Sequence, residues 1–183
     1  HVFDGSTTRR VGLATPAALG TPTNTGSGTY AATLRYYKMA YTVQASGTTL
    51  YRSELSASVP FTPSGSGTGA VITKSTAISE GETHWEIYAS TDNATFYGPI
   101  TAAIVIGTTT YTDSTATTAY SALSAAPLVG QNTNWTSVKY IVSDGNRLIG
   151  AGGWETGAKF NRVWFSPSAG TTGRKSRRPT SPS

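Results

Sequence analysis

The chain has 183 residues, a formal net charge of +5, no Cys, and 13% charged residues, about half the usual share of a soluble protein. Without Cys, thiolate catalysis, disulfide cross-links and Cys-based zinc sites are excluded, and two His, His1 and His84, cannot form a His-rich metal centre. Thr, Ser and Gly dominate and strong helix formers are scarce, which favours an all-β protein of extracellular or virion type over a helical enzyme.

The first segment, residues 1–29, is expected to form an extended arm. His1–Gly5 has the pattern of a short strand that ends in an Asp-Gly turn. The linker that follows is rich in Thr, Pro, Gly and Ala, and it cannot bury enough apolar surface to fold alone. We therefore expect it to lie against another body or to join two bodies.

The next segment, residues 30–124, is expected to form a β-sandwich. Leu34–Val43 is rich in Tyr and apolar on both faces, as a central strand is. Pro60 lacks an N–H group and so predicts that Val59–Phe61 is an edge strand. Further short strands are expected at 49–52, 70–73, 83–89, 96–97, 100–106 and 109–112. This density of short strands and turns is typical of a sandwich.

The strand expected at Thr83–Ala89 alternates most clearly in this segment. Its pattern places Trp85, Ile87 and Ala89 on one face, and His84, Glu86 and Tyr88 on the other.

Residues 125–170 are expected to form a small β unit. Short strands are predicted at 138–142, 147–151 and 162–165, with a hairpin turn at Asp144-Gly145-Asn146 between the first two. Trp135, Trp154 and Trp164 crowd into this unit, which has few other core residues. Because so small a body is hard to stabilise alone, we expect it to pack on the sandwich or on another subunit.

Most of the net charge lies in the C-terminal tail, residues 171–183. The basic residues of this tail are Arg174, Lys175, Arg177 and Arg178. The rest of the chain keeps ten of the 14 basic residues against nine acidic ones, a net charge of +1. A nucleic-acid-binding surface needs a basic face interleaved with aromatic residues, so nucleic acid is not expected as a partner.

No apolar run approaches the roughly 18 residues of a membrane span, so a membrane is not expected as a partner either.

The stretch from Tyr36 to Thr112 resembles a fibronectin type III domain. The resemblance rests on the Tyr-rich 34–43, on 85–91, and on Arg52–Ser58, which is similar to the Gly-Glu-Ser-x-x-Ser turn of that family. Thr109–Asp113 resembles the closing strand of the family and its Asp. The resemblance implies an Ig-like sandwich over about half of the chain.

The flanking segments resemble bacteriophage tail-associated virion proteins. Phe3-Asp4-Gly5, Arg10–Leu13 and the Pro-rich linker are similar to the N-terminal segment of those proteins. Val138–Leu148 and Asn161–Ser166 are similar to the first blade of their β-propeller-like region. The sequence departs from that pattern after this blade, where the basic tail follows. The resemblance therefore implies a virion protein with one propeller-like blade.

Acidic residues and His84 are the candidate catalytic or metal-binding groups of the sequence. His84 is interpreted as a strand residue paired with a neighbour, since no second His lies in the body. Glu80, Glu82 and Glu86 could form a glycosidase carboxylate pair or bind Ca²⁺. However, Glu80 and Glu82 flank Gly81 in a turn, which favours a solvated loop. We predict no catalytic residue, metal site or cofactor, and a hydrolase is the weakest hypothesis because no acid, base and nucleophile set can be assembled.

The leading hypothesis is a non-enzymatic virion structural protein of a tailed bacteriophage, whose partners are copies of itself and other virion proteins. Its arms would bridge neighbouring subunits, with anchors at Trp135, Trp154, Trp164, Phe165 and the four basic residues of the tail. The alternative is a carbohydrate- or receptor-binding module of a phage fibre or a secreted glycosidase, with a host-surface glycan as partner. Tyr residues that could stack on sugars are Tyr36, Tyr37, Tyr41 and Tyr51, although Tyr in sandwich strands more often packs in the core.

Overall fold

The computed structural model describes residues 2–3, 8–9, 12–25, 32–64, 69–132, 140–143, 148–151 and 163–165. The chain divides into two compact units, His1–Asn134 and Trp135–Ser183. Strands make up nearly all of the regular structure in the described residues, and every strand pairing among them is antiparallel. The predicted all-β fold is therefore confirmed.

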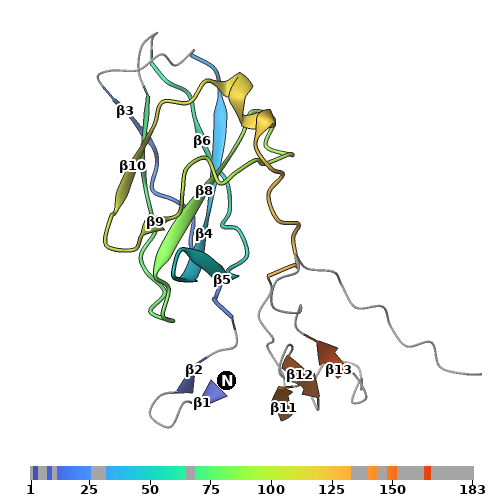
Figure 1. The fold of residues 1–183 in the computed structure, drawn as a ribbon. Coiled ribbons are helices and arrows are strands. Elements are labelled where there is room, and N and C mark those ends of the chain that lie inside the picture. The colour runs from blue at the N-terminus through green and yellow to red at the C-terminus, as the bar shows by residue number, and fades with distance from the viewer. Residues whose placement is uncertain are drawn as a thin grey trace, which may run out of the picture. The chain divides into compact units, whose positions relative to one another are not determined.

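A five-stranded sheet forms one layer of the sandwich in the first unit (Figure 1). Its strands are β4 (Arg35–Ala45), β5 (Thr48–Arg52), β6 (Val59–Phe61), β8 (His84–Ser90) and β9 (Ile104–Val105). β4 lies at the centre, with β8 on one side and with β5 and β6 in succession on the other. β9 pairs with the far side of β8. The strand that contains Pro60 pairs with β4 alone among the described strands, which confirms its predicted edge position.

A three-stranded sheet forms the other layer. Its strands are β3 (Thr23–Asn24), β7 (Ala70–Thr73) and β10 (Thr110–Asp113), with β7 in the middle. The 3₁₀ helix η1 (Thr117–Ala122) follows β10 and contributes the buried Tyr120. The sequence pattern of 117–122 does not predict this helical turn.

The main core lies between the two sheets. Tyr37, Met39 and Tyr41 of β4 point into it, and Trp85 of β8 stands opposite Tyr41 in the strand register. Ile72 of β7 packs into the same core from the smaller sheet. Since alternate residues of a strand point to opposite faces, the apolar alternation of β4 and β8 is what orients these side chains inward. Trp85, Ile87 and Ala89 share one face of β8, as its alternation predicts, and this face points into the main core.

The outer face of the larger sheet carries a second, smaller apolar cluster. Its buried members are Ala40, Tyr88 and Phe96, with Tyr36 and Leu55 packed against them. Ala126, from the segment after η1, also packs there. β4 is therefore buried on both faces, as the Tyr-rich pattern of 34–43 predicts. β8 is buried on both faces as well, which its alternating pattern did not predict.

The N-terminal boundary of the sandwich differs from the predicted one. Leu13 and Leu19 are 1% and 5% exposed and belong to the main core. β3 pairs with β7, and the N–H group of Gly20 donates to the carbonyl of Thr73 at 3.1 Å. The described residues of 12–25 are therefore part of the sandwich, whereas the composition predicts a domain start at residue 30. Two leucines spaced within a Thr/Pro-rich segment carry too weak a periodicity to reveal this.

The C-terminal boundary also differs, because the segment after η1 stays bound to the sandwich. The N–H group of Ala126 donates to the carbonyl of Phe96 at 2.8 Å. Glu54 accepts from the N–H groups of Gly130 and Asn132, at 3.1 and 2.5 Å. The boundary lies between Asn134 and Trp135 rather than at 124/125. The Ala/Pro/Gly composition of this segment suggested a linker, but its backbone groups are hydrogen-bonded to the sandwich.

Two glycines allow close approaches that another residue would block. Gly98 has a φ of +152°, and a Cβ there would lie 2.8 Å from the carbonyl oxygen of Ile87. A Cβ on Gly69 would lie 2.7 Å from the carbonyl oxygen of Asp113, where β7 begins beside β10. Both distances are shorter than real Cβ contacts, so Gly is required at these two positions.

The terminal segments contain further antiparallel strands. β1 (Val2–Phe3) pairs with β2 (Thr8–Arg9). In the second unit, β11 (Tyr140–Ser143), β12 (Leu148–Ala151) and β13 (Val163–Phe165) form a three-stranded sheet with β12 in the middle. β1, β11, β12 and β13 lie close to their predicted places, whereas β2 and β3 were not predicted. The strands predicted at 96–97 and 100–106 are reduced to an isolated bridge at Tyr97 and to β9. The predicted turn at 144–146 lies outside the described residues.

Candidate functional site

The predicted interface residues are mostly outside the described part of the chain. This holds for Trp135, Trp154, Arg174, Lys175, Arg177 and Arg178. Trp164 and Phe165 lie in β13, where Trp164 stands opposite Gly150 and Phe165 opposite Ile149. Only their backbone positions are described. Their role as anchors therefore stays a prediction.

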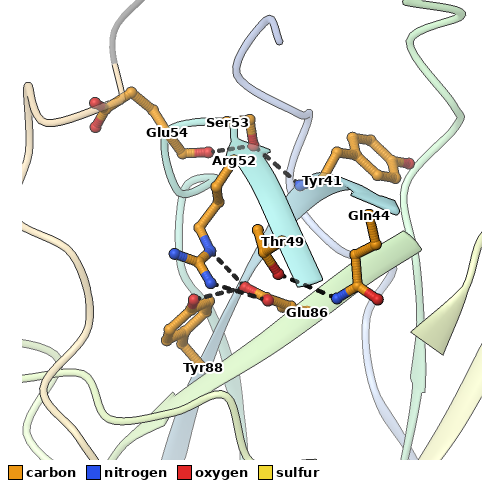
Figure 2. Close-up of polar contacts among 8 residues, drawn as sticks. All are labelled: Tyr41, Gln44, Thr49, Arg52, Ser53, Glu54, Glu86 and Tyr88. Carbon is orange, nitrogen blue, oxygen red and sulfur yellow. Dashed lines mark hydrogen bonds and ion pairs between the residues drawn. The ribbon is translucent and has the colours of Figure 1, made fainter. Parts of the chain in front are cut away.

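The outer face of the larger sheet holds a buried ion pair (Figure 2). Arg52 at the end of β5 contacts both carboxylate oxygens of Glu86 on β8, with Nε to Oε2 at 2.5 Å and Nη2 to Oε1 at 3.0 Å. The hydroxyl of Tyr88 donates to Oε2 of Glu86 at 2.8 Å. Glu86 and Tyr88 are buried, and the side chain of Arg52 is 25% exposed. This forked contact ties β5 to β8 across β4.

The electrostatics of this cluster keep Arg52 charged and Tyr88 neutral. Burial raises the pKa of the Tyr88 hydroxyl, and the negative charge of Glu86 raises it further. Burial by itself would lower the pKa of Arg52, but its hydrogen bonds and electrostatic interactions with Glu86 and Tyr88 together raise the pKa above its usual value. Because both oxygens of Glu86 are engaged, the cluster is built as a structural cross-link between strands.

A second polar network lies inside the sandwich, where β4, β10 and η1 meet. Oδ2 of Asp113 accepts from the hydroxyls of Tyr120 and Tyr37, at 2.6 and 2.9 Å. Oδ1 of Asp113 accepts from the N–H group of Thr115 at 2.9 Å. Arg35 donates from Nη1 to the carbonyl of Thr115 and to the hydroxyl of Tyr120, at 2.8 and 3.0 Å. These contacts join β4 to β10 and to η1.

The sequence carries one signal for this network, the buried position of Arg35. Arg35 is completely buried in a strand whose apolar pattern predicts burial. A buried cation requires polar partners, so an acidic residue or carbonyl had to lie opposite it. The partners of Arg35 are the carbonyl of Thr115, between β10 and η1, and the hydroxyl of Tyr120 in η1, 80 and 85 residues away in the chain. Sequence spacing alone does not identify them.

The acidic loop before β8 binds backbone groups of the protein itself. Glu82 accepts from the N–H groups of Ser79 and Glu80, at 2.9 and 2.8 Å. Burial by itself would raise the pKa of Glu82, but these backbone donors lower it below its ordinary value. Glu80 accepts from the N–H group of Ala14 at 2.6 Å and so holds the N-terminal segment in place. The expected solvated loop is therefore incorrect for Glu82, which is buried.

His84 and the four Tyr residues occupy structural positions. Nδ1 of His84 lies 2.8 Å from Oγ1 of the neighbouring Thr83, which is the predicted pairing with a neighbour. Tyr37 and Tyr41 are buried in the main core, and Tyr36 packs against the outer cluster. Only Tyr51 is well exposed, at 46%. The stacking surface considered for sugars is thereby reduced to Tyr51 among these four residues.

Within the described residues, no group of three or more His, Asp or Glu side chains could hold a metal ion. No helix in that part of the chain is long and apolar enough to span a bilayer. Comparison of the chain with protein-family models, curated proteins and solved structures found no match. The functional interpretation therefore depends on the geometry of the chain itself.

Proposed function

We propose that the chain is a non-enzymatic structural protein of a tailed bacteriophage virion, located in the tail or in a tail-associated assembly. Its sandwich would act as a rigid spacer or docking module, in contact with copies of itself and with other virion proteins. The observation that best supports this role is the use of buried charge. Glu86, Asp113 and Arg35 all contact groups on other elements of the sandwich, so they make the body stiff.

The proposal includes a fibronectin III-like sandwich whose strands follow one another along the chain in a different order than in that family. In Ig-type sandwiches, strands A, B and E face a sheet formed by C, F and G. In this proposal, β3, β7 and β10 correspond to A, B and E, because β7 pairs with both of the others. β8, β4 and the β5–β6 edge would correspond to C, F and G, with β9 beside β8. The chain therefore visits F and G before B, C and E.

This strand order disagrees with the sequence resemblance at Thr109–Asp113. By sequence this segment resembles the last strand of the family, which belongs to the C-F-G sheet. Instead, β10 pairs with β7 in the smaller sheet. Spatial order supports the family resemblance, and chain order does not follow it.

The interface part of the proposal rests on residue chemistry. Buried Trp residues dominate the energetics of protein interfaces. The proposed apolar anchors are Trp135, Trp154, Trp164 and Phe165, and the proposed basic contacts are Arg174, Lys175, Arg177 and Arg178. The proposed location is the virion, outside the host cell.

The proposal is tested on purified particles of the source phage. Mass spectrometry of the particles should detect the chain, and antibody labelling in electron micrographs should place it on the tail. Particles that lack the chain would overturn the proposal. Trp164→Ala should reduce incorporation into particles, whereas Trp164→Phe, which keeps an aromatic ring, should retain most of it. Equal incorporation of both variants would reject Trp164 as an anchor.

The alternative is a carbohydrate- or receptor-binding module. The observation that favours it is the exposure of Tyr51 and Leu50 on β5. An aromatic ring exposed on a strand can stack on a sugar ring. A glycan array probed with the chain should then give saturable signals that Tyr51→Ala abolishes. An array without signal, with the chain present in particles, would favour the structural role.

A further inference from the structure

β10 presents an open edge of the smaller sheet. The N–H group of Lys74 donates to the carbonyl of Thr109 at 2.9 Å, and the register pairs Tyr111 with Ile72 and Asp113 with Ala70. Since bonded pairs alternate along an antiparallel ladder, residues 109, 111 and 113 direct their backbone groups toward β7. The N–H and C=O groups of Thr110 and Thr112 therefore point away from the sheet. Among the described residues, no hydrogen bond reaches them.

The other edges of the sandwich have features that oppose pairing with another chain. β9 and β3 have two residues each. The opposite edge of the larger sheet has Pro60 in β6, a register shift between β4 and β5 beside Val43, and the charged Arg52. Short strands, proline, bulges and charges are the usual protections of a sheet edge.

β10 has fewer of these protections, and its one charged residue, Asp113, lies buried at the end of the strand. The strand has four residues in continuous register with β7, without proline or register shift. Thr110 and Thr112 are exposed and uncharged, and Tyr111 between them is partly buried at the rim of the main core. Thr and Tyr are favoured in strands. This edge is therefore suited to accept another extended strand.

We propose that β10 pairs with β10 of a second copy, antiparallel and about a twofold axis through Tyr111. The smaller sheets of the two copies would then join into one continuous sheet. This proposal rests on the proposed structural role, and it names the surface that makes the contact between copies.

The second copy is the occupant that fits the edge because the edge is self-complementary. With Tyr111 opposite Tyr111, Thr110 of one copy stands opposite Thr112 of the other, and the outward N–H and C=O groups of both residues are satisfied. Cross-strand Thr–Thr pairs are favourable, and neither residue introduces like-charge repulsion. A twofold contact also requires the same patch on both subunits, which a single edge strand provides.

The test is sedimentation velocity of the full chain over a concentration series. The mass should rise from the 19.1 kDa of one chain toward that of a dimer as concentration increases. Thr112→Pro removes an outward N–H group and should weaken dimerisation at least tenfold, whereas Thr112→Ala keeps that group and should dimerise within about threefold of the wild type. Near-ultraviolet circular dichroism checks that each variant is folded.

A second variant guards against misfolding of Thr112→Pro. Thr110→Lys places like charges across the twofold axis and should also weaken dimerisation, more so at low salt. A wild-type chain that stays monomeric, or folded Thr112→Pro and Thr110→Lys variants that dimerise like the wild type, would overturn the pairing of β10. A monomeric chain that is present in particles would overturn this inference alone. A dimeric chain that is absent from particles would overturn only the virion role.

Discussion

Each buried carboxylate of the sandwich is held by several donors. Glu86 is bound by Arg52 and Tyr88, and Asp113 by the hydroxyls of Tyr37 and Tyr120. An isolated buried charge is costly, so the chain keeps these residues only because their partners are in place. The sequence predicted the faces of β8 correctly from its alternation. It did not predict the partners of Glu86, because Arg52 is brought next to it by the pairing of β5 with β4.

Replacing Glu86 by Gln should lower the free energy of unfolding by about 2 kcal/mol, since Arg52 loses its charged partner but is partly solvated. Tyr88→Phe removes only one hydroxyl contact of the same carboxylate and should cost about 1 kcal/mol. Urea denaturation followed by Trp fluorescence measures both. An unchanged midpoint for Glu86→Gln would show that the ion pair does not stabilise the fold.

Glu82 should make stability depend on pH in the acidic range. Its pKa in the folded protein is below the ordinary value of 4.5, so its stabilisation is fully present above that pH and is lost as the pH falls through the lower, folded value. At pH 7, Glu82→Gln should be less stable than the wild type by about 1 to 2 kcal/mol. The difference should shrink as the pH is lowered below 4.5.

Urea denaturation of both proteins at several pH values measures this difference directly. The comparison isolates Glu82 because the other carboxylates titrate alike in the two proteins. A difference that stays constant from pH 7 to the acidic end of the series would contradict the role given to its charge.

At the scale of elements, the chain between β5 and β6 continues the edge of the larger sheet without being a regular strand. The N–H groups of Ser53 and Ser56 donate to the carbonyls of Tyr41 and Met39, at 2.9 and 2.8 Å. In return, the hydroxyls of the two serines accept from the N–H groups of the same two β4 residues, at 2.9 and 3.0 Å. Figure 2 shows the hydrogen bond from the N–H group of Tyr41 to the hydroxyl of Ser53. Side chains thus complete a ladder that the backbone leaves incomplete.

This seam explains what the sequence could and could not predict at that scale. Arg52–Ser58 resembles a turn of fibronectin type III domains, so a turn was expected there. The strands on either side were predicted close to their observed bounds. The role of the serine hydroxyls could not be predicted, because a Ser-rich segment without apolar alternation is typical of a loop. Its place beside β4 depends on the long-range pairing of β6.

Ser53→Ala and Ser56→Ala should each lower the free energy of unfolding by about 1 to 2 kcal/mol. Each leaves a buried N–H group of β4 without its acceptor, at Tyr41 or at Met39. Ser58→Ala in the same segment is the matched control, since its hydroxyl makes neither of these contacts. Thermal unfolding of the three variants compares them, and a control that is destabilised as much as the others would argue against this account.

At the scale of the whole chain, the sandwich unit extends beyond residues 30–124, the bounds expected from composition, and includes residues of 12–25 and 125–132. Strand content and the sandwich could be predicted, because alternation and turn spacing are local properties of the sequence. The boundaries could not, because they depend on which segments pack against the core. The backbone of 12–25 is held by β7 and by Glu80, and that of 125–132 by Phe96 and Glu54.

This boundary has a measurable consequence for fragments of the chain. A fragment of residues 1–134 contains the whole first unit and should unfold cooperatively. A fragment of residues 30–134 starts at the boundary expected from composition, and it lacks Leu13, Leu19 and β3. Loss of two buried leucines alone should cost about 4 kcal/mol or more, enough to destabilise a domain whose total stability is about 5 to 15 kcal/mol.

Urea denaturation of the two fragments measures the difference, and a third fragment, 12–134, separates the contributions. Because the core leucines, β3 and the Ala14–Glu80 contact all lie after residue 11, fragment 12–134 should match 1–134 in its midpoint. Fragment 30–134 should unfold at a clearly lower urea concentration or fail to fold. If all three fragments unfolded at the same midpoint, residues 12–25 would add nothing to the stability of the sandwich, and the composition-based boundary at residue 30 would stand.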